Sequence, residues 1–301
     1  MGRLITRLRE WIEAWAGDRP FPLRAGGFLI TFVLVLGSGG TGWLLERLIL
    51  PPSPLPQPLA AFLLVIALAS ALAARSLRDS VLAVLQVLPD LPSARERLSW
   101  IVGRDVSQLD QDGILRASAE TASENAVDGL FAPLFWMLIG AALWKAGFSQ
   151  GPGPLALAWA FKASSTLDSM LGYKQGRLRW LGTAGARLDD LLTWLPCRMV
   201  LITLPLVSMS WNKWPTTVRA AAADGRPDPS PNAGLSESIF AHCADVQMGG
   251  LNRYRSTWIN KPLLSAQSCK ATASGVRKLL NLGLRLEAAW LVVAAGFSFV
   301  Q

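Results

Sequence analysis

Long uncharged blocks alternate with polar stretches along this chain of 301 residues. Residues 26–45 and 51–74 carry no charged side chain, and a membrane-spanning helix needs about 20 predominantly apolar residues. The two blocks therefore predict a transmembrane hairpin. Further apolar blocks cover residues 129–144 and 191–211. The last block, residues 288–300, is short for a full span, so we expect it to be membrane-embedded or re-entrant.

The polar stretches between these blocks divide the chain into four segments. Residues 1–74 form an N-terminal amphipathic helix and the transmembrane hairpin, and residues 75–129 form a polar helical segment with an acidic stripe. Residues 130–211 hold membrane helices, some of them broken, with polar motifs between them. Residues 212–301 form a basic region with a Pro- and Gly-rich loop, followed by an apolar helix. The predicted fold class is all-α, a polytopic helical integral membrane protein.

Composition and charge support this class. The chain is 51% hydrophobic and only 17% charged, its mean hydropathy is +0.33, and thirteen tryptophans against two tyrosines suit interfacial belts. The net charge of +8 fits basic residues that flank membrane spans, and no basic run interleaved with aromatics suggests nucleic acid. The three cysteines show no CxxC spacing, so zinc and redox motifs are not indicated.

The N-terminal 25 residues contain five arginines and an apolar face at helical spacing, formed by Leu8, Trp11, Ile12 and Trp15. This pattern predicts a helix at the membrane surface, and the arginines place the N-terminus in the cytoplasm. We expect a multi-pass protein of the bacterial inner membrane.

An acidic stripe lies where the chain turns hydrophobic. Arg116, Glu120, Glu124 and Asp128 recur every four residues and would share one helix face. Carboxylates beside an apolar slab are costly unless cations, a metal or a ligand compensate them. The alternative is a solvated face with ordinary ion pairs.

Three other features have a structural and a functional interpretation. The string GSGGTG at 37–42 matches a dinucleotide fingerprint but lies in a predicted membrane helix, so close helix packing is favoured. The lone histidine, His242, is expected to be packed or solvent-facing. Arg198 stands among apolar residues with Pro196 and Pro205 nearby, which indicates either a broken helix lining a cavity or an arginine that snorkels to the interface.

Six strings in order resemble the cobinamide-phosphate synthase family of cobalamin biosynthesis (CobD/CbiB). They are AARSLRD (73–79), IVGRD (101–105), ETASENAVDGLFAPLFW (120–136), STLDSMLGYK (165–174), ARLDDLLTWLPCR (186–198) and DGRPDPSPNAG (224–234), followed by a reduced MGG (248–250). The chain departs from the family pattern in its start, in Ser165 at a usual asparagine position, and in residues 235–250, although Glu237 keeps the register of a family glutamate.

The resemblance implies an ATP-dependent ligase. It attaches the amine of an aminopropanol, commonly as its phosphate, to a carboxylate of (adenosyl)cobyric acid. ATP and the corrinoid are substrates, and Mg²⁺ is the expected cofactor. A divergent scaffold for other membrane-associated corrinoid enzymes is the alternative. A corrinoid transporter is a third possibility, suggested by the features around Arg198.

The resembling strings supply residue types for each task. Oxygen ligands for Mg²⁺ are expected from Glu120, Glu124 and Asp128. Expected catalytic residues are Glu120, Glu124, Asp168, Asp189 and Asp190, of which the last three are metal ligands or an amine-binding set. Expected substrate- and phosphate-binding residues are Arg104, Asn125, Lys174, Arg187, Arg198, Asp224, Arg226, Ser230, Asn232 and Glu237, with Asp224 and Arg226 in a closing loop.

Overall fold

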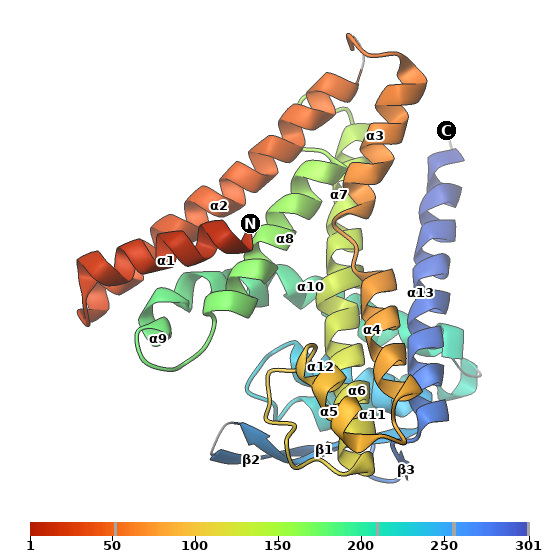
Figure 1. The fold of residues 1–301 in the computed structure, drawn as a ribbon. Helices are drawn as coiled ribbons and strands as arrows, with labels where there is room; N and C mark the ends of the chain where they lie inside the picture. The colour runs from red at the N-terminus through yellow and green to blue at the C-terminus, as the bar shows by residue number, and fades with distance from the viewer. Residues whose placement is uncertain (51–52, 209–210, 255–256, 300–301) are drawn as a thin grey trace. The chain divides into compact units, whose positions relative to one another are not determined.

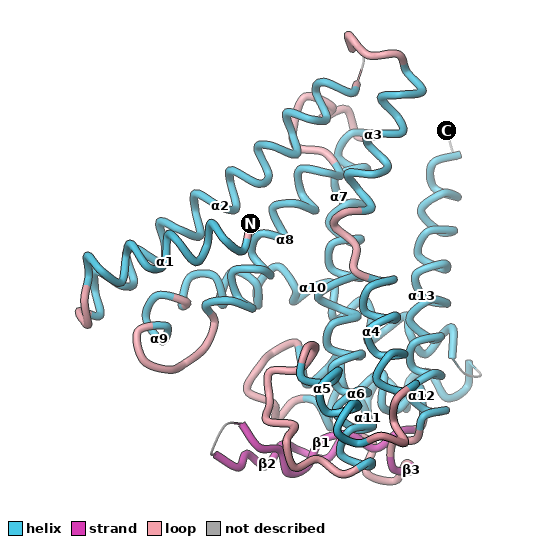
Figure 2. Tube along the Cα trace, viewed as in Figure 1, coloured by secondary structure: helices cyan, strands magenta, loops and turns pink. Residues whose placement is uncertain are grey.

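The computed structural model describes residues 1–50, 53–208, 211–254 and 257–299. These residues form helices, one of them a π-helix, and one small sheet (Figures 1 and 2). The elements are α1 (Gly2–Ala16), α2 (Pro20–Ile49), α3 (Gln57–Ala69), α4 (Ala74–Gln86), α5 (Leu91–Ser99), α6 (Gln111–Ala126), the π-helix η1 (Val127–Phe131), α7 (Ala132–Lys145), α8 (Pro154–Leu171), α9 (Leu178–Leu181), α10 (Thr183–Ser208), the short 3₁₀-helix η2 (Trp211–Lys213), α11 (Trp214–Gly225), α12 (Ala233–Ala244), β1 (Val246–Tyr254), β2 (Thr257–Leu264), β3 (Cys269–Lys270) and α13 (Ala273–Phe299).

Four helical stretches in the described ranges are long and apolar enough to cross a membrane. They are Pro20–Ile49, Gln111–Lys145, Thr183–Ser208 and Ala273–Gly296. A fifth span results if α3 and α4, which meet at a 44° bend, are counted as one. The predicted helical membrane protein is confirmed. Residues 51–52 of the second predicted span lie outside the described residues.

The chain divides into two compact units whose segments interleave along the sequence. Unit 1 comprises Met1–Leu72 and Ala132–Thr193, and unit 2 comprises Ala73–Phe131 and Trp194–Gln301. The predicted segments at 1–74, 75–129, 130–211 and 212–301 are therefore stretches of sequence that the two units share between them.

Unit 1 is held together by the packing of α2 against α8. A Cβ atom on Gly42 would lie 2.9 Å from Ala156 Cα, and one on Gly39 would lie 3.2 Å from Ala160 Cβ. The GSGGTG string is thus a close helix contact, as predicted, because only glycine allows the two backbones to approach this far. Helix α1 packs Ile5, Ile12 and Ala16 into a core with α2 and α8, and its two tryptophans are exposed.

The structure corrects two expectations about helices, namely the broken-helix alternative for Arg198 and the short last segment. Helix α10 runs unbroken from Thr183 to Ser208, although Pro196 and Pro205 lie inside it. Pro196 cannot donate to the carbonyl of Leu192, and the Trp136 indole N–H donates to that oxygen instead, at 3.1 Å. The last helix, α13, begins at Ala273, so it is long enough for a full span rather than a short embedded segment.

Unit 2 surrounds α6 with α4, α5, α12, α13 and β1. The sheet, which the sequence analysis did not predict, has the order β2-β1-β3, with β1 antiparallel to β2 and parallel to β3 (Figure 1). Helix α6 continues into α7 through the π-helix η1. Because a π-turn is wider than an α-turn, the four-residue stripe that starts at Arg116 loses its register before Asp128.

Candidate functional site

Helix α6 is buried on most sides because alanine, serine and threonine occupy seven of the ten positions from Ala117 to Ala126. Small side chains allow the neighbouring elements to approach closely. Glu120 stands in the middle of this helix and is itself buried. A buried carboxylate is stable only with hydrogen bonds and opposite charge around it, so its partners identify the polar centre of unit 2.

Glu120 is satisfied on both oxygens. Oε1 accepts the Gly249 N–H at 2.8 Å and lies 3.9 Å from Arg116 Nε, and Oε2 is bound by the Arg104 guanidinium. Gly249 adopts a φ of +84°, and a Cβ there would collide with the Pro262 carbonyl, so the position requires glycine. Both oxygens of Glu120 are therefore used to hold Arg104 and the β1 backbone at Gly249 in place.

Arg104 and Arg116 converge on one amide. Both guanidinium groups donate to Asn252 Oδ1, Arg116 at 3.3 Å, and Arg116 also donates to the Leu251 carbonyl at 2.9 Å. The loop that carries Arg104 is tied to β1 through a hydrogen bond from the Asp105 N–H to the Arg253 carbonyl.

Two buried donors of this group have no acceptor among the described residues. They are Arg116 Nε and Asn252 Nδ2. Unmet buried donors are costly, and the two arginines supply positive charge at the same place. An anionic oxygen from a ligand would satisfy both donors. This part of unit 2 is therefore suited to a carboxylate or phosphate group.

A second set of charges faces the same centre. Lys261 Nζ donates to Glu237 Oε1 at 3.1 Å and lies 3.6 Å from Asp228 Oδ2. The pKa of Glu237 is raised to about 8, chiefly because the side chain is buried; Lys261 opposes the rise, and the charges of Glu124 and Glu120 contribute to it. The pKa of Glu237 therefore lies close to neutral pH, where the side chain can gain or lose a proton.

Glu124 differs from its neighbours. Its carboxylate lies within electrostatic reach of Lys261, Asp228, Glu120 and Arg104, but it makes no hydrogen bond or ion pair with any residue that the structure describes. It is partly exposed. Glu124 is therefore the carboxylate of this centre whose oxygens remain available to a ligand.

The Pro-rich loop between α11 and α12 is anchored at both ends. Arg198 donates to Asn232 Oδ1 at 2.9 Å and to the Pro231 carbonyl at 3.0 Å. Asp224 Oδ2 accepts from His242 Nε2 at 2.8 Å and from the Ser265 N–H at 3.0 Å. His242 is thus a paired residue, and Arg198 anchors the loop.

Other predicted residues lie differently. Ser230 Oγ accepts the Ala233 N–H at 3.1 Å and so caps α12. Asn125 is exposed and donates to the Thr121 carbonyl at 2.9 Å. Three predicted cationic residues are exposed: Lys174, Arg187 and Arg226. Their substrate-binding roles stay predictions.

The second predicted acidic set lies in unit 1. Asp189 is buried and within electrostatic reach of Asp168, Asp190 and Lys162. Asp190 is also within reach of Lys174. The structure therefore gathers these three predicted carboxylates, whereas Arg187 on the same helix is exposed.

Within the described ranges, no three His, Cys, Asp or Glu side chains are placed to hold one ion. Glu120 is committed to Arg104, and Asp128 lies within electrostatic reach of Cys197 in α10. The Mg²⁺ prediction remains untested for these residues, and Glu124 has free oxygens to offer.

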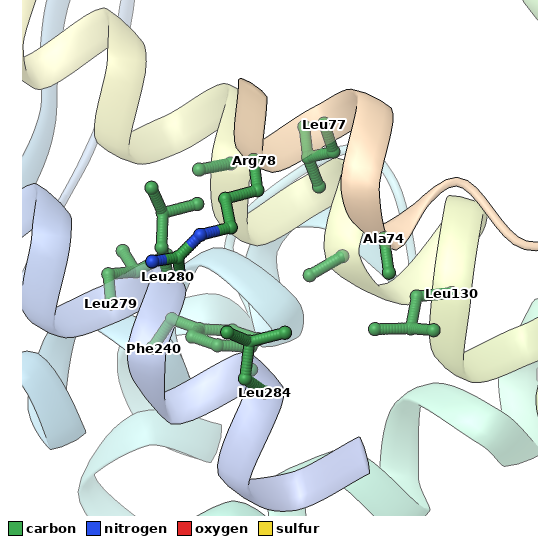
Figure 3. Close-up of a pocket in the computed structure, with 11 residues that line it drawn as sticks. Ala74, Leu77, Arg78, Leu130, Phe240, Leu279, Leu280 and Leu284 are labelled. Atoms are coloured by element: carbon green, nitrogen blue, oxygen red, sulfur yellow. The ribbon is translucent and has the colours of Figure 1, made fainter. Parts of the chain in front are cut away.

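A separate apolar cleft, open to solvent, lies in unit 2 (Figure 3). Leucines of α4, η1 and α13 line it with Phe240 of α12, and Arg78 reaches across from α4 towards Leu280. Arg78 donates to Asn281 Oδ1 at 3.1 Å. None of the predicted site residues lines this cleft.

Sequence reasoning missed several members of the polar centre, namely Asn252, Lys261 and Asp228, and it assigned Arg116 no site role. Asn252 follows the MGG string by two residues, and a β-strand prediction there would have directed it towards α6. Lys261 gives no local signal, because its place depends on the antiparallel pairing of β2 with β1.

Comparison with known proteins agrees with the sequence motifs. The family model described as CobD/Cbib protein matches residues 1–283. The cobalamin biosynthesis protein CobD of Synechocystis sp. is 41% identical over 243 residues, covering 80% of this chain and 68% of the relative. CobD of Yersinia enterocolitica is 35% identical and CbiB of Salmonella arizonae 33% identical, each covering 94% of this chain and 84% of the relative.

No solved structure matches the chain. The family model covers almost the whole length, and the relatives exceed 30% identity over most of both sequences. This chain therefore belongs to the CobD/CbiB family.

Proposed function

We propose that this protein is an ATP-dependent amide ligase of cobalamin biosynthesis. It joins the primary amine of an aminopropanol or its phosphate to a carboxylate of cobyric acid, which carries its upper adenosyl ligand or lacks it. Several relatives are named cobalamin biosynthesis proteins, and the motifs of this chain resemble the ligase family.

The observation that carries the proposal is the pair of unmet donors, Arg116 Nε and Asn252 Nδ2, beside Arg104. A ligase of this kind handles anionic oxygens on the carboxylate substrate and on ATP. Donors that point at developing negative charge, with fixed positive charge beside them, stabilise phosphoryl transfer. The unmet donors of unit 2 lie beside two arginines, which supports the proposal.

The chemistry requires activation of the carboxylate. The γ-phosphoryl group of ATP moves to a carboxylate oxygen, which gives an acyl phosphate and ADP. The ammonium loses one proton, the amine nitrogen attacks the carbonyl carbon, and the bond to the phosphate oxygen breaks. Inorganic phosphate leaves and the nitrogen loses a second proton, so the step balances.

The residues of unit 2 divide this work. Arg104 and Arg116 offset phosphate charge, and Asn252 donates to an anionic oxygen. Glu237, with a pKa of about 8, is suited to exchange a proton near neutral pH. Mg²⁺, when bound, offsets further phosphate charge. It is commonly held by one or two carboxylates and the substrate phosphates, and Glu124 is the carboxylate with free oxygens.

The two alternatives differ in what supports them. The transporter interpretation depended on a broken helix around Arg198, and α10 is continuous there. The scaffold interpretation predicts binding without turnover, so a conversion assay separates it from the ligase.

The test uses the full-length protein in lipid nanodiscs with cobyric acid, ATP, MgCl₂ and 1-amino-2-propanol phosphate. Mass spectrometry follows the amide product, and ADP is measured alongside. We expect product from the wild type and a loss of about a hundredfold or more in Glu124→Gln. Asp112→Asn, an exposed change on the same helix, should leave the rate unchanged.

A second variant separates binding from folding. Asn252→Asp replaces the unmet donor with an acceptor between two arginines, so we expect the melting temperature to hold or rise while the KM for ATP increases at least tenfold. Absence of product from the wild type would favour the scaffold. If Glu124→Gln keeps its rate but loses stability, the assignment of Glu124 to the site is wrong.

A further inference from the structure

Three buried oxygen atoms in unit 1 have no hydrogen-bond partner among the described residues. They are Ser164 Oγ on α8 and Asp189 Oδ1 and Thr193 Oγ1 on α10. Their residues are 0%, 8% and 1% exposed. Buried polar atoms are nearly always hydrogen-bonded to protein, to an ordered water or to a ligand, and each one left unmet is unfavourable.

The packing of the two helices aligns these atoms. Gly182 abuts the Leu171 carbonyl, and a Cβ on Gly185 would lie 3.1 Å from Leu167 Cβ. Residue numbers rise along α10 as they fall along α8, so the helices run antiparallel. One further turn brings Asp189 level with Ser164, and Thr193 follows Asp189 on the same face of α10.

The charges around these atoms favour a cation. Asp189 interacts with Asp168, Asp190 and Lys162, and Asp190 also interacts with Lys174. Three carboxyl groups face two ammonium groups in this mostly buried place, so acidic groups outnumber basic ones there. An anionic ligand would add to that excess, whereas one further positive charge would balance it.

The shape of the acceptor set favours an ammonium group over a metal ion. A primary ammonium carries three N–H donors on one compact centre, and three unmet acceptors line this strip. The described residues contain no cluster of three His, Cys, Asp or Glu side chains placed for a metal. Two of the three acceptors here are hydroxyl oxygens, which hydrogen-bond an ammonium readily.

We propose that Asp189, Thr193 and Ser164 form the site that binds the primary ammonium of the amine substrate. This proposal rests on the proposed function, because it assigns a place to the amine that the ligase uses. Asp189 supplies the opposite charge, and the two hydroxyl oxygens accept the remaining hydrogen bonds. Asp168 and Asp190 add negative potential around them.

Ligand binding to the full-length protein tests the proposed ammonium site and does not require that the protein turn over its substrates. Calorimetry in nanodiscs compares 1-amino-2-propanol phosphate with 1,2-propanediol 2-phosphate, in which a hydroxyl replaces the ammonium. We expect the wild type to prefer the amine at least tenfold. Asp189→Asn keeps the size and one oxygen but removes the charge, so the preference should disappear while the affinity for the diol stays the same.

Two further variants distinguish binding from folding. Thr193→Val removes an unmet buried hydroxyl, so the melting temperature should hold or rise while the affinity for the amine falls about threefold or more; a protein that merely loses its packing would show the reverse. Asp18→Asn, an exposed change in unit 1, should leave the preference intact.

The outcomes separate this proposal from the proposed function. If Asp189→Asn retains the wild-type preference for the amine, or the wild type shows none, the ammonium site is wrong even where product forms. If the preference is lost in Asp189→Asn but the wild type forms no amide, the ammonium site stands and the ligase function fails.

Discussion

Glu46 offers a direct test of how a buried charge stabilises unit 1. It lies near the end of α2 with no exposed surface. Its Oε2 accepts the Gly153 N–H at 3.0 Å, and its Oε1 accepts those of Leu155 at 2.5 Å and Ala156 at 3.3 Å. These are the first amides of α8, which have no partner within that helix. Glu46 therefore caps α8 from another helix.

The magnitude follows from the number of amides. Each buried donor left unmet costs about 1–3 kcal/mol, so Glu46→Ala loses about 3 kcal/mol at the lower bound. The cavity adds about 1 kcal/mol or more, and removal of a buried charge returns part of the cost. We expect a net loss of about 3–4 kcal/mol. Glu46→Gln keeps one carbonyl oxygen and loses about 1–2 kcal/mol, because the amide nitrogen faces the donor of Gly153.

Two measurements check the effect. Unfolding in mixed micelles, followed by tryptophan fluorescence, gives the ranking of the three proteins. Hydrogen exchange of a peptide covering residues 147–158 locates the change, because the freed amides exchange faster. Glu10→Gln, an exposed change on α1, is the control and should stay within about 0.5 kcal/mol of the wild type.

If Glu46 caps α8, two results must be observed together. Glu46→Ala must lose clearly more stability than Glu46→Gln, because only the alanine variant leaves all three amides unmet. The lost protection must also lie at the start of α8. Equal stability of the two variants, or unchanged exchange in residues 147–158, would refute the reasoning.

The remaining predictions concern packing and pH. Gly42→Ala should lower the free energy of unfolding by about 1–3 kcal/mol, because the added methyl group meets Ala156 at 2.9 Å. In a thermal unfolding assay its control is Gly40→Ala, whose methyl group meets nothing within 4 Å, so this variant should be neutral or stabilising. Glu237 has a pKa of about 8 against an ordinary 4.5, so the folded state binds more protons between these values, and the free energy of unfolding falls as the pH rises from about 5 to about 8. Glu237→Gln should flatten that slope, and an unchanged slope would show that another group causes it.

Much of the membrane fold follows from the sequence because long apolar blocks have few alternatives in a bilayer. The helix α2, its close packing at residues 37–42 and the start of α8 after GPGP follow from local composition. The continuity of α10 does not, because tertiary contacts decide whether the carbonyl freed by a proline finds another donor. Here Trp136, 56 residues away, provides that donor.

The candidate site could be predicted only in part. Glu120, Glu124 and Arg104 were identified from the stripe and the family motifs, and the structure gathers them. Asn252 and Lys261 were missed because their positions depend on strand pairing, which a hydrophilic stretch does not reveal. Asp128 was expected on the same helix face as Glu120 and Glu124, which assumes a continuous α-helix. The π-helix η1 begins after α6 and changes that spacing, and no feature of the sequence marks it.

The charged residues discussed above on the helices of this protein fall into two groups according to their hydrogen-bond partners. Glu46 and Glu120 have hydrogen bonds on both carboxylate oxygens, and Arg198 is bound by a loop. Glu124 has no such partner among the described residues, and Asp189 has one oxygen unmet. A fully paired buried charge is explained by folding alone, whereas a carboxylate oxygen without a protein partner is available to bind a ligand. This difference, which identical residue types conceal in the sequence, is why Glu124 and Asp189 are the carboxylates to which ligand-binding roles are assigned.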